Sequence, residues 1–352
     1  MEFGLSEEQT LLQDSVRKFL SEESSLDKVR KLCADQDDAV IWRGLADLGI
    51  AGMLIPEDHG GVGLGTLEAS IISEQLGFHI TPSPFISSAV MVPNILLSAE
   101  SHIDLLPSLA DGSKRIGIAF GETLALRHDK GISESKGLLN GKATFVLDSQ
   151  ADAYLVATQG KSIYLVDAKD VSRSNRTSID LTRSTCELLL ENSKASLVSN
   201  NGHIFDQAIN IGRIMLAADT LGAAQNMIDK SVAYAKERKQ FERAIASFQA
   251  VKHMCAEMTA GLEPCRSMVW YASHAFDNLP KETAFTSCQC KAHISEIGKF
   301  VAKTATEVHG GMGFTDLVGL HYWFKRIGFN RQILGSPEML REEAAKLQGL
   351  IA

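Results

Sequence analysis

Apolar residues change their spacing twice along the chain, and the two changes divide it into three stretches. In the first stretch they recur every three or four residues, which is typical of amphipathic helices. Ser6 and Gln9 fit a capping box that begins the first helix, and further helical runs lie at 67–76 and 85–97. We therefore expect a helical N-terminal domain over residues 1–112.

The second stretch consists of short β-type runs separated by turn residues. The runs read RIGIAF, ATFVL, AYLVAT, SIYLVD, ELLL and ASLV. Asn140 and Gly141 form a pair of the kind that closes a tight hairpin. The pattern predicts a small antiparallel β domain over residues 113–200.

The third stretch returns to helical spacing in longer runs. Apolar residues recur at three and four over 209–238, 247–276 and 282–310, which predicts a C-terminal helical bundle over residues 201–352. The fold class is therefore α+β, with a β domain between two helical domains. This order, without internal repeats or a linker rich in Pro, Gly or Ser, favours a multidomain enzyme over a repeat array or a scaffold.

Composition and charge narrow the possible functions. The 352 residues are 45% hydrophobic and 22% charged, as in globular proteins, and 35 Lys and Arg against 43 Asp and Glu give a net charge of −8. No segment concentrates positive charge, which excludes a nucleic acid as the main ligand. The start of the chain does not resemble a signal peptide, and no run of about 18 apolar residues occurs, which predicts a cytoplasmic protein that does not enter a membrane.

The cysteines indicate neither a disulfide framework nor a metal site. They include one Cys-x-Cys pair and no Cys-x-x-Cys pair, so we expect reduced and mostly buried thiols and no bound metal. The six are Cys33, Cys186, Cys255, Cys265, Cys288 and Cys290.

Two glycine-rich loops, HGGVGLG at 59–65 and HGGMGF at 309–314, invite comparison with phosphate-binding loops. A dinucleotide fingerprint follows a strand, whereas each of these loops follows a predicted helix. Taken alone, both loops are interpreted as helix-ending turns in which Gly adopts a positive φ.

The segment ERKQFERAIASFQAVKHMCAEM at 237–258 has two interpretations. In the first, Arg238 and Lys239 belong to a solvated turn between two helices, which is the commoner meaning of a charge cluster. In the second, the turn is an anion clamp, in which Arg238 pairs with a pyrophosphate and Gln249 binds a nearby polar group.

These segments together resemble the acyl-CoA dehydrogenases. The resemblance covers nearly the whole chain, through FGLSEEQTLLQDSVRKFL, LGIAGMLIPEDHGGVGLG, LAADTLGAAQ, RKQFERAIASFQAVKHMCAEM and EVHGGMGFT. It implies the family's fold with a C-terminal four-helix bundle, noncovalent FAD and an acyl-CoA substrate. It also implies that a carboxylate removes the α proton, that hydride passes from the β carbon to the flavin, and that an electron-transferring flavoprotein reoxidises the flavin.

In this family the FAD lies across a subunit interface, with its ring held by one subunit and its ADP part by the neighbour. The resemblance assigns an intact ADP side to this chain. Arg238 and Phe241 match the Arg-x-x-Phe element, with Gln240 between them, and Gln249 matches the amide that follows it. Glu307 stands where many members have Gln, and His309 where others have an apolar residue. The glycine loop under the adenine side matches Gly310, Gly311 and Gly313.

The ring side departs from the family pattern. The stretch Thr-Glu-Pro-x-x-Gly-Ser-Asp corresponds to Gly121 through His128, where only Glu122 is retained. The family's Trp-x-Thr, whose hydroxyl bonds the flavin N5, corresponds to Phe145-Val146-Leu147, and a leucine cannot donate a hydrogen bond. We therefore expect this chain to lack a complete ring side.

The resemblance also leaves the catalytic base unassigned. One family placement corresponds to Leu334, within Ile333-Leu334-Gly335-Ser336, and the other corresponds to Gly212. Neither residue is an acid. The nearby carboxylates Glu338, Asp219 and Asp316 are expected to be helix-surface or capping acids.

Three hypotheses follow. In the first, the chain is a shortened companion subunit resembling those of bacterial steroid side-chain degradation, in an α2β2 assembly with a second acyl-CoA dehydrogenase subunit that carries the base. In the second, it is a homodimeric flavoenzyme with other chemistry, of the monooxygenase or desulfinase type. In the third, it is a binding subunit without flavin. The acyl group and the identity of the partner do not follow from the sequence.

Overall fold

The computed structural model describes residues 4–124, 131–175 and 178–351. Its first part is helical, as predicted, and Ser6 and Gln9 form the expected capping box: the Ser6 hydroxyl accepts from the Gln9 backbone N–H, and the Gln9 side chain accepts from the Ser6 N–H at 2.9 Å. The helices are α1 (Glu7–Glu23), α2 (Leu26–Asp35), α3 (Ala39–Asp47), α4 (Thr66–Phe78), the π-helix η2 (Phe85–Met91), α5 (Val92–Ala99) and α6 (Leu106–Ala110), with short 3-10 turns η1 (Glu57–His59) and η3 (Ile103–Leu105).

The middle part is a sheet in the strand order β6-β7-β3-β1-β4-β5-β8, with β2 paired to β3. Its elements are β1 (Ile116–Ala119), α7 (Gly121–Leu124), β2 (Ile132–Ser135), β3 (Leu138–Leu147), β4 (Ala153–Ala157), β5 (Ile163–Asp167), η4 (Ala168–Asp170), β6 (Ser172–Asn175), β7 (Thr185–Lys194) and β8 (Ser196–Ser199). The prediction of an antiparallel unit is wrong for one pair, because β1 and β4 are parallel. Since β3 runs antiparallel to β1 and the chain reverses before β4, β4 runs parallel to β1 when it pairs on the other side.

The predicted hairpin turn at Asn140-Gly141 is also wrong. Both residues lie inside β3, and the β2–β3 hairpin turns at Lys136 and Gly137, with Ser135 paired to Leu138. Lys136 and Gly137 have φ values of 53° and 77°, as a tight two-residue turn requires. The actual turn lies four residues before the Asn-Gly pair, because β3 runs through Asn140 and Gly141 without a break.

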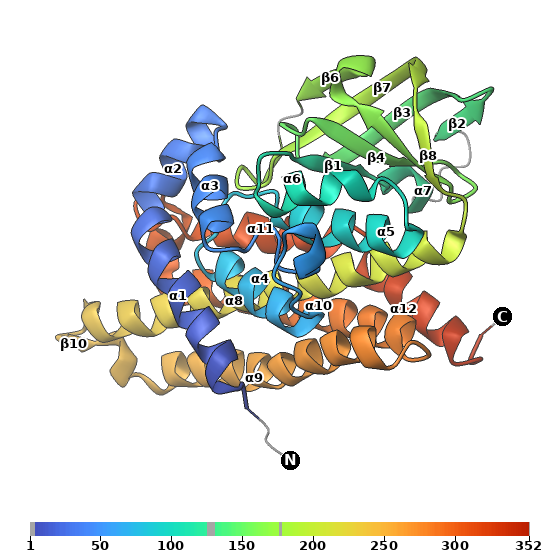
Figure 1. The fold of residues 1–352 in the computed structure, drawn as a ribbon. Coiled ribbons are helices and arrows are strands. Elements are labelled where there is room, and N and C mark those ends of the chain that lie inside the picture. Colours follow the sequence, from blue (N-terminus) through green and yellow to red (C-terminus); the bar gives the residue numbers. More distant parts are fainter. Residues whose placement is uncertain (1–3, 125–130, 176–177, 352) are drawn as a thin grey trace.

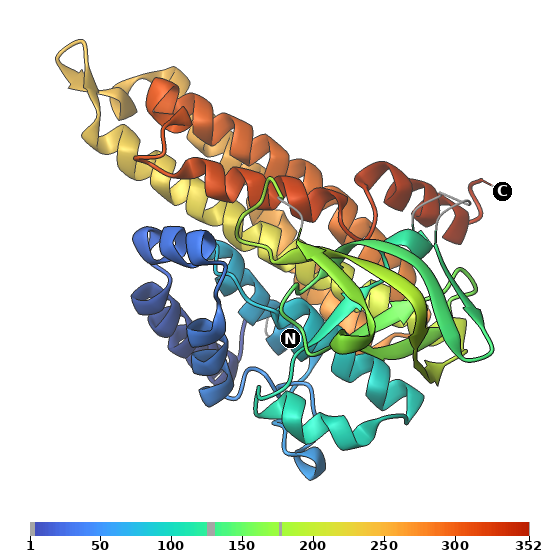
Figure 2. The ribbon, with the colours of Figure 1, turned by 90° about the horizontal axis from the view of Figure 1, so that it is seen from above.

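The third part consists of long helices. They are α8 (Gly202–Glu237), α9 (Gln249–Asn278), α10 (Thr283–His309), α11 (Leu320–Gln332) and α12 (Pro337–Leu347). Between α8 and α9 lie a small hairpin, β9 (Lys239–Gln240) and β10 (Arg243–Ala244), and the 3-10 turn η5 (Ile245–Ser247). The 3-10 turn η6 (Gly310–Phe314) follows α10. Helix α8 is buried almost all round over 208–224, because α4 packs on one side of it and α10 on the other (Figure 1). Figure 2 shows the sheet in front of part of the bundle, and α5 contacts β1 and β8.

A buried ionic cluster joins the three parts of the chain. Asp219 on α8 accepts from Arg326 on α11 at 2.6 Å and pairs with Arg183, which precedes β7, at 2.9 Å. Asn330 donates to Asp219 at 2.6 Å, and Arg326 donates to the carbonyl of Thr81 at 3.1 Å. Asp219 is 1% exposed, so its prediction as a helix-surface or capping acid is wrong.

Two expectations about the whole chain can be compared with the structure. All six cysteines are free thiols; five are buried and Cys255 is half-buried, as predicted. In the part of the chain that the structure describes, no helix is both long enough and apolar enough to cross a bilayer.

Candidate functional site

The hairpin after α8 presents an aromatic side chain to solvent. Its tip is formed by Phe241 and Glu242, between the paired residues Gln240 and Arg243. Phe241 and Glu242 have φ values of 52° and 64°, and Phe241 is 86% exposed. A bulky residue in the left-handed region costs free energy, and so does an aromatic ring in water. This combination is typical of a residue that awaits a ligand or a second chain.

Polar groups surround the base of the same hairpin. Arg238 caps the end of α8 and is exposed, and its guanidinium has no ion-pair partner among residues 4–124, 131–175 and 178–351. Gln240 and Gln249 are also exposed; Gln240 donates through Nε2 to the Lys239 carbonyl at 2.9 Å, and Gln249 Nε2 lies 3.0 Å from His253 Nε2 on its own helix. All three exposed side chains can reach an external anion or polar group.

The glycine loop lies beside this hairpin. The ring of Tyr234, near the end of α8, stacks on His309, the last residue of α10, at 4.5 Å. A Cβ added at Gly310 or Gly311 would meet no atom within 4 Å, so the backbone at both residues faces open space. At Gly313 a Cβ would lie 2.8 Å from the Thr306 carbonyl oxygen, so this glycine is needed for packing.

The residues assigned to the ADP side therefore gather at one end of the molecule. His309 is 3% exposed and donates through Nδ1 to the Ala305 carbonyl at 2.8 Å, and burial lowers the pKa of its imidazole. His309 packs under the glycine loop, 3.2 Å from the position that a Cβ of Gly313 would take. Glu307 is exposed and lies 3.7 Å from Lys303. A cofactor contact by Glu307 or His309 stays a prediction. The open backbone at Gly310 and Gly311, beside a free arginine, fits a phosphate-bearing cofactor.

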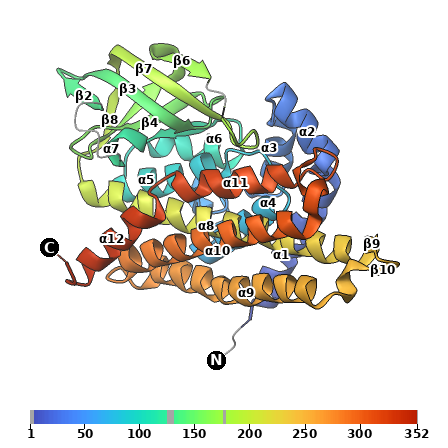
Figure 3. The same ribbon diagram turned by 180° about the vertical axis from the view of Figure 1, so that it is seen from behind.

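The ring-side residues lie at the opposite end. Helix α8 is continuous from Gly212, at the ring-side end, to Glu237, next to Arg238. At 1.5 Å per residue, Gly212 and Glu237 are about 38 Å apart along the helix axis. Figure 3 shows the hairpin β9–β10 at one end of the bundle and α7 and α12 at the other. Within one chain, the two sets of residues cannot meet.

A cleft of about 190 Å³ marks the ring-side end. It is lined by Gly121, Glu122, Leu124, Thr144, Phe145, Gln332, Ile333, Leu334, Gly335 and Met339. Glu122 is buried; one of its carboxylate oxygens accepts from the Thr144 hydroxyl, and the other has no hydrogen-bond partner among the described residues. Phe145 lies in a β-bulge with a φ of 52° and is 63% exposed. The remainder of the predicted ring-side stretch, 125–128, lies outside the described residues.

The structure brings the two predicted base positions together. Leu334 Cδ1 lies 2.6 Å from the point that a Cβ of Gly212 would occupy. Leu334 has a φ of 57°, and its carbonyl accepts from Arg213 Nε at 3.0 Å. The next carbonyl, of Gly335, accepts from Lys291 Nζ at 2.6 Å. The backbone at the predicted base position is therefore held in place by hydrogen bonds, although the residue at that position, Leu334, is apolar.

Comparison with known proteins decides the family. The models of the acyl-CoA dehydrogenase N-terminal and C-terminal domains match residues 6–113 and 200–348. A curated relative, the acyl-CoA dehydrogenase IpdE2 of Mycobacterium tuberculosis, is 31% identical over 339 residues, which cover 95% of this chain and 96% of the relative. The chain belongs to the acyl-CoA dehydrogenase family. The predicted fold is confirmed, and the cofactor of this family of oxidoreductases is FAD, as predicted.

Other matches agree with this assignment. IpdE2 of Mycolicibacterium smegmatis is 26% identical, over 98% of this chain and 99% of the relative. Among solved structures, a variant of the Tcur3481-Tcur3483 steroid acyl-CoA dehydrogenase has a TM-score of 0.88 and 25% identity, over 98% of both chains. A chain of the ChsE4-ChsE5 complex from Mycobacterium tuberculosis has a TM-score of 0.90, and at 23% identity it supports the fold.

The two other carboxylates considered from the sequence, Glu338 and Asp316, have partners of their own. Glu338 lies in the first turn of α12, exposed and paired with Arg331 at 2.7 Å. Backbone and Ser336 hydrogen bonds together with Arg331 lower its pKa to about 2. Asp316 is exposed near Arg30. Both are surface acids, as predicted.

The sequence did not reveal the buried groups that fix the base loop. Arg213 forms two 2.8 Å bonds to Glu343 on α12, and Lys291 is fully buried on α10, where burial lowers the pKa of its ammonium to about 7. Lys291 could have been noticed from the sequence, because it is a lysine among the regularly spaced apolar residues of 282–310. Arg213 was harder to recognise, because its partners lie more than 70 residues away in the sequence.

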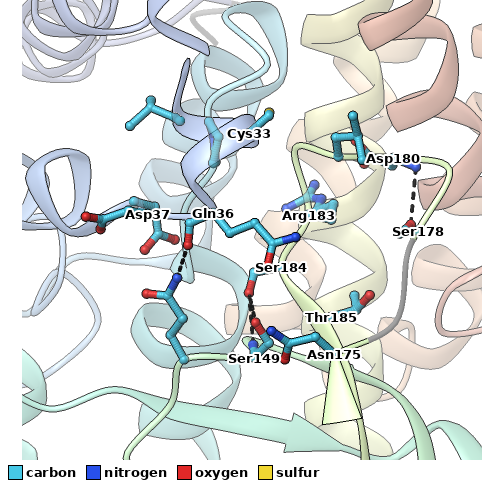
Figure 4. Close-up of a pocket in the computed structure, with 15 residues that line it drawn as sticks. Cys33, Gln36, Asp37, Ser149, Asn175, Ser178, Asp180, Arg183, Ser184 and Thr185 are labelled. Carbon is cyan, nitrogen blue, oxygen red and sulfur yellow. Dashed lines mark hydrogen bonds between the residues drawn. The ribbon is translucent and has the colours of Figure 1, made fainter. Parts of the chain in front are cut away.

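A separate polar pocket of about 80 Å³ lies between α2 and the loop before β7 (Figure 4). Its wall includes Gln36, which accepts from the Gln150 side chain, and Ser149, whose hydroxyl lies 2.5 Å from that of Ser184. Burial raises the pKa of Asp180, which lies on the same wall. These contacts join the N-terminal helices to the sheet, so the pocket belongs to the domain junction. The described residues contain no group of three or more potential metal ligands.

Proposed function

We propose that this chain is the companion subunit of a heteromeric, FAD-dependent acyl-CoA dehydrogenase. It supplies the ADP half of a shared FAD site, and a second acyl-CoA dehydrogenase subunit supplies the ring half and the catalytic base. The domain limits 1–112, 113–200 and 201–352 belong to the same proposal. The observation that carries it is the asymmetry between the two ends of α8, one with exposed polar groups and open glycines and the other with an apolar base position.

At the ADP end, Arg238 binds the pyrophosphate, because a guanidinium fork pairs well with phosphate oxygens. Phe241 packs against the cofactor with its exposed ring, which offsets the cost of its left-handed backbone. Gln240, Gln249 and Glu307 contact its polar groups, and the backbone of Gly310, Gly311 and Gly313 lies under the adenine side, supported by His309.

At the ring end, this chain offers no acid at Gly212 or Leu334. An α proton of a thioester is weakly acidic, so its removal needs a desolvated carboxylate together with hydrogen bonds to the carbonyl. The carboxylate is therefore assigned to the partner. FAD, when bound, supplies the acceptor for the hydride that leaves the β carbon.

The substrate class is an acyl-CoA thioester of the kind met in steroid degradation. Support comes from the matched steroid acyl-CoA dehydrogenase at 25% identity over 98% of both chains. The assembly is α2β2 and passes its electrons to an electron-transferring flavoprotein. It contains one FAD per pair of unlike chains.

The test is the flavin stoichiometry of the assembly. The chain is co-expressed with an acyl-CoA dehydrogenase chain encoded beside it that carries Glu at a base position, and native mass spectrometry counts the chains and the FAD. We expect two copies of each chain and two FAD molecules. A homomeric complex with one FAD per chain would contradict the proposal.

One observation favours the second candidate, a homodimeric flavoenzyme with other chemistry. A cleft of about 190 Å³ is present at the ring side, and the exposed Phe145 is available to stack on a ring. In that case the chain expressed alone would purify with a flavin absorbance spectrum. Colour that appears only on co-expression supports the heteromer, and no colour in either case supports a binding subunit without flavin.

A further inference from the structure

Gly212 and Leu334 define where a reacting carbon would have to lie in this chain. They correspond to two alternative positions of one base, and both alternatives must reach the same α proton. The structure places the two residues in direct contact, although they are 122 positions apart in the sequence. The point between them is therefore the place that a substrate α carbon would have to approach.

That point is filled by apolar side chains. Leu334 Cδ1 and Met91 Sδ lie 2.6 Å and 2.9 Å from the position that a Cβ of Gly212 would take. Met91 is fully buried and Leu334 is 4% exposed. Leu334 is among the residues that line the cleft described above, and it packs together with Met91 against Gly212, neither of which lines the cleft.

The filling is fixed by the surrounding structure. Arg213 and Lys291 donate to the carbonyls of Leu334 and Gly335, so an outward movement of the loop would cost each of these buried groups a hydrogen bond. Met91 ends the π-helix η2, an irregularity that is often found beside functional sites. The left-handed backbone at Leu334 would suit glycine better, yet a leucine stands there.

We infer that Leu334 and Met91 form an apolar plug that closes the acyl channel of this chain's own cleft. The inference rests on the proposed function and extends it. The plug keeps acyl-CoA out of the ring side that lacks a base, so the thioester binds only where the partner supplies both ring side and base. Leu334 is thus a specificity-determining residue: it decides which of the two ring-side clefts in a pair of chains accepts substrate.

The experiment counts acyl-CoA molecules bound to the co-expressed complex. Equilibrium dialysis with labelled octanoyl-CoA is expected to give one molecule per pair of unlike chains in the wild type. Leu334→Gly removes the plug at a position whose φ favours glycine, and the count is expected to rise toward two. The affinity of the new site should exceed that of the wild-type cleft by about tenfold or more, because several methylene groups of the ligand become buried.

Two further variants keep the test sharp. Met91→Ala opens the same channel from η2 and should act as Leu334→Gly does, which covers the case in which one variant fails to fold. Met339→Ala is the matched control, because Met339 lines the outer, exposed part of the cleft, and its count should stay at one.

Two molecules per pair in the wild type would overturn the plug, and so would a count of one in both opened variants. The FAD content of the same samples, read from visible absorbance, tests the proposed function separately. One FAD per chain would contradict the shared site, whereas the acyl-CoA count alone decides whether the plug exists.

Discussion

At the scale of single residues, two side chains stand at backbone conformations that are unfavourable for a residue other than glycine. Phe241 and Leu334 both adopt left-handed backbone conformations, and neither is a glycine. The first exposes its ring to solvent, and the second buries its side chain against Gly212. Such strain persists where the surroundings enforce it, and it gathers at functional sites. Phe241 belongs to the proposed shared FAD site, and Leu334 belongs to this chain's own ring-side cleft.

The clearest prediction at this scale concerns Arg238. Replacing it with Ala removes a charge-assisted hydrogen bond to the pyrophosphate, so FAD affinity should fall by about 1.5–3 kcal/mol, or one to two decades. Retention of FAD by the complex after gel filtration measures the loss. Arg341→Ala, which removes an exposed arginine on α12 at the other end of the molecule, should leave retention unchanged. Equal retention in both variants would count against the assignment.

At the scale of elements, sequence patterns predicted what depends on local spacing and missed what depends on distant partners. The helices and most strands follow from their periodicity, and the capping box from two residues three positions apart. The direction of β4 relative to β1 and the burial of Asp219 could not be predicted, because each depends on elements more than 30 residues away. At the site, motif residues were found from the sequence, whereas the carbonyl contacts of Arg213 and Lys291 were not.

Lys291 gives α10 a predictable pH dependence. Its folded pKa of about 7 lies below the ordinary lysine value, so between pH 7 and about 10.4 the unfolded chain binds more protons than the folded one. Stability from this group therefore rises with pH across that window, by at most about 1.4 kcal/mol per unit, and this gain is lost as pH falls from about 10.4 to 7. In Lys291→Met the dependence should disappear. Urea unfolding of both proteins at several pH values measures the difference, and parallel curves would refute the burial of a titrating lysine.

The cluster around Asp219 holds three elements together, and its charge is essential. Burial alone would raise the pKa of this carboxyl, but Arg183 and Arg326 outweigh that effect and hold the pKa below its ordinary value. Asp219→Asn keeps the shape and leaves two buried arginines without their shared counter-charge, which should cost about 3–5 kcal/mol of unfolding free energy. The exposed Asp316→Asn should cost less than about 0.5 kcal/mol. Chemical denaturation distinguishes the two, and a similar small loss in both would show that the cluster is dispensable.

At the scale of the whole molecule, the length of α8 separates the two halves of the site. In the proposed function, the functional residues at each end of this helix are completed by another chain. A second copy of this chain would bring another cleft without a base, whereas an unlike chain can bring both ring-side donors and a carboxylate. The same separation explains how one subunit could lose its base while its ADP end remained useful to a partner.

The chain purified alone should therefore not oxidise acyl-CoA. With an artificial electron acceptor and a panel of short, long and steroid-type acyl-CoAs, we expect turnover only after the partner is added.

Within the active complex, Arg238→Ala in this chain should lower the rate at limiting FAD, because the flavin is lost, and excess FAD should restore it. Replacing Glu338 or Asp316 by the matching amide should not change the rate, because both carboxylates are exposed and Glu338 is already paired with Arg331. Robust turnover by the chain alone, abolished by replacing one of its own carboxylates, would show that the base lies within this chain and that the assignment to a partner is wrong.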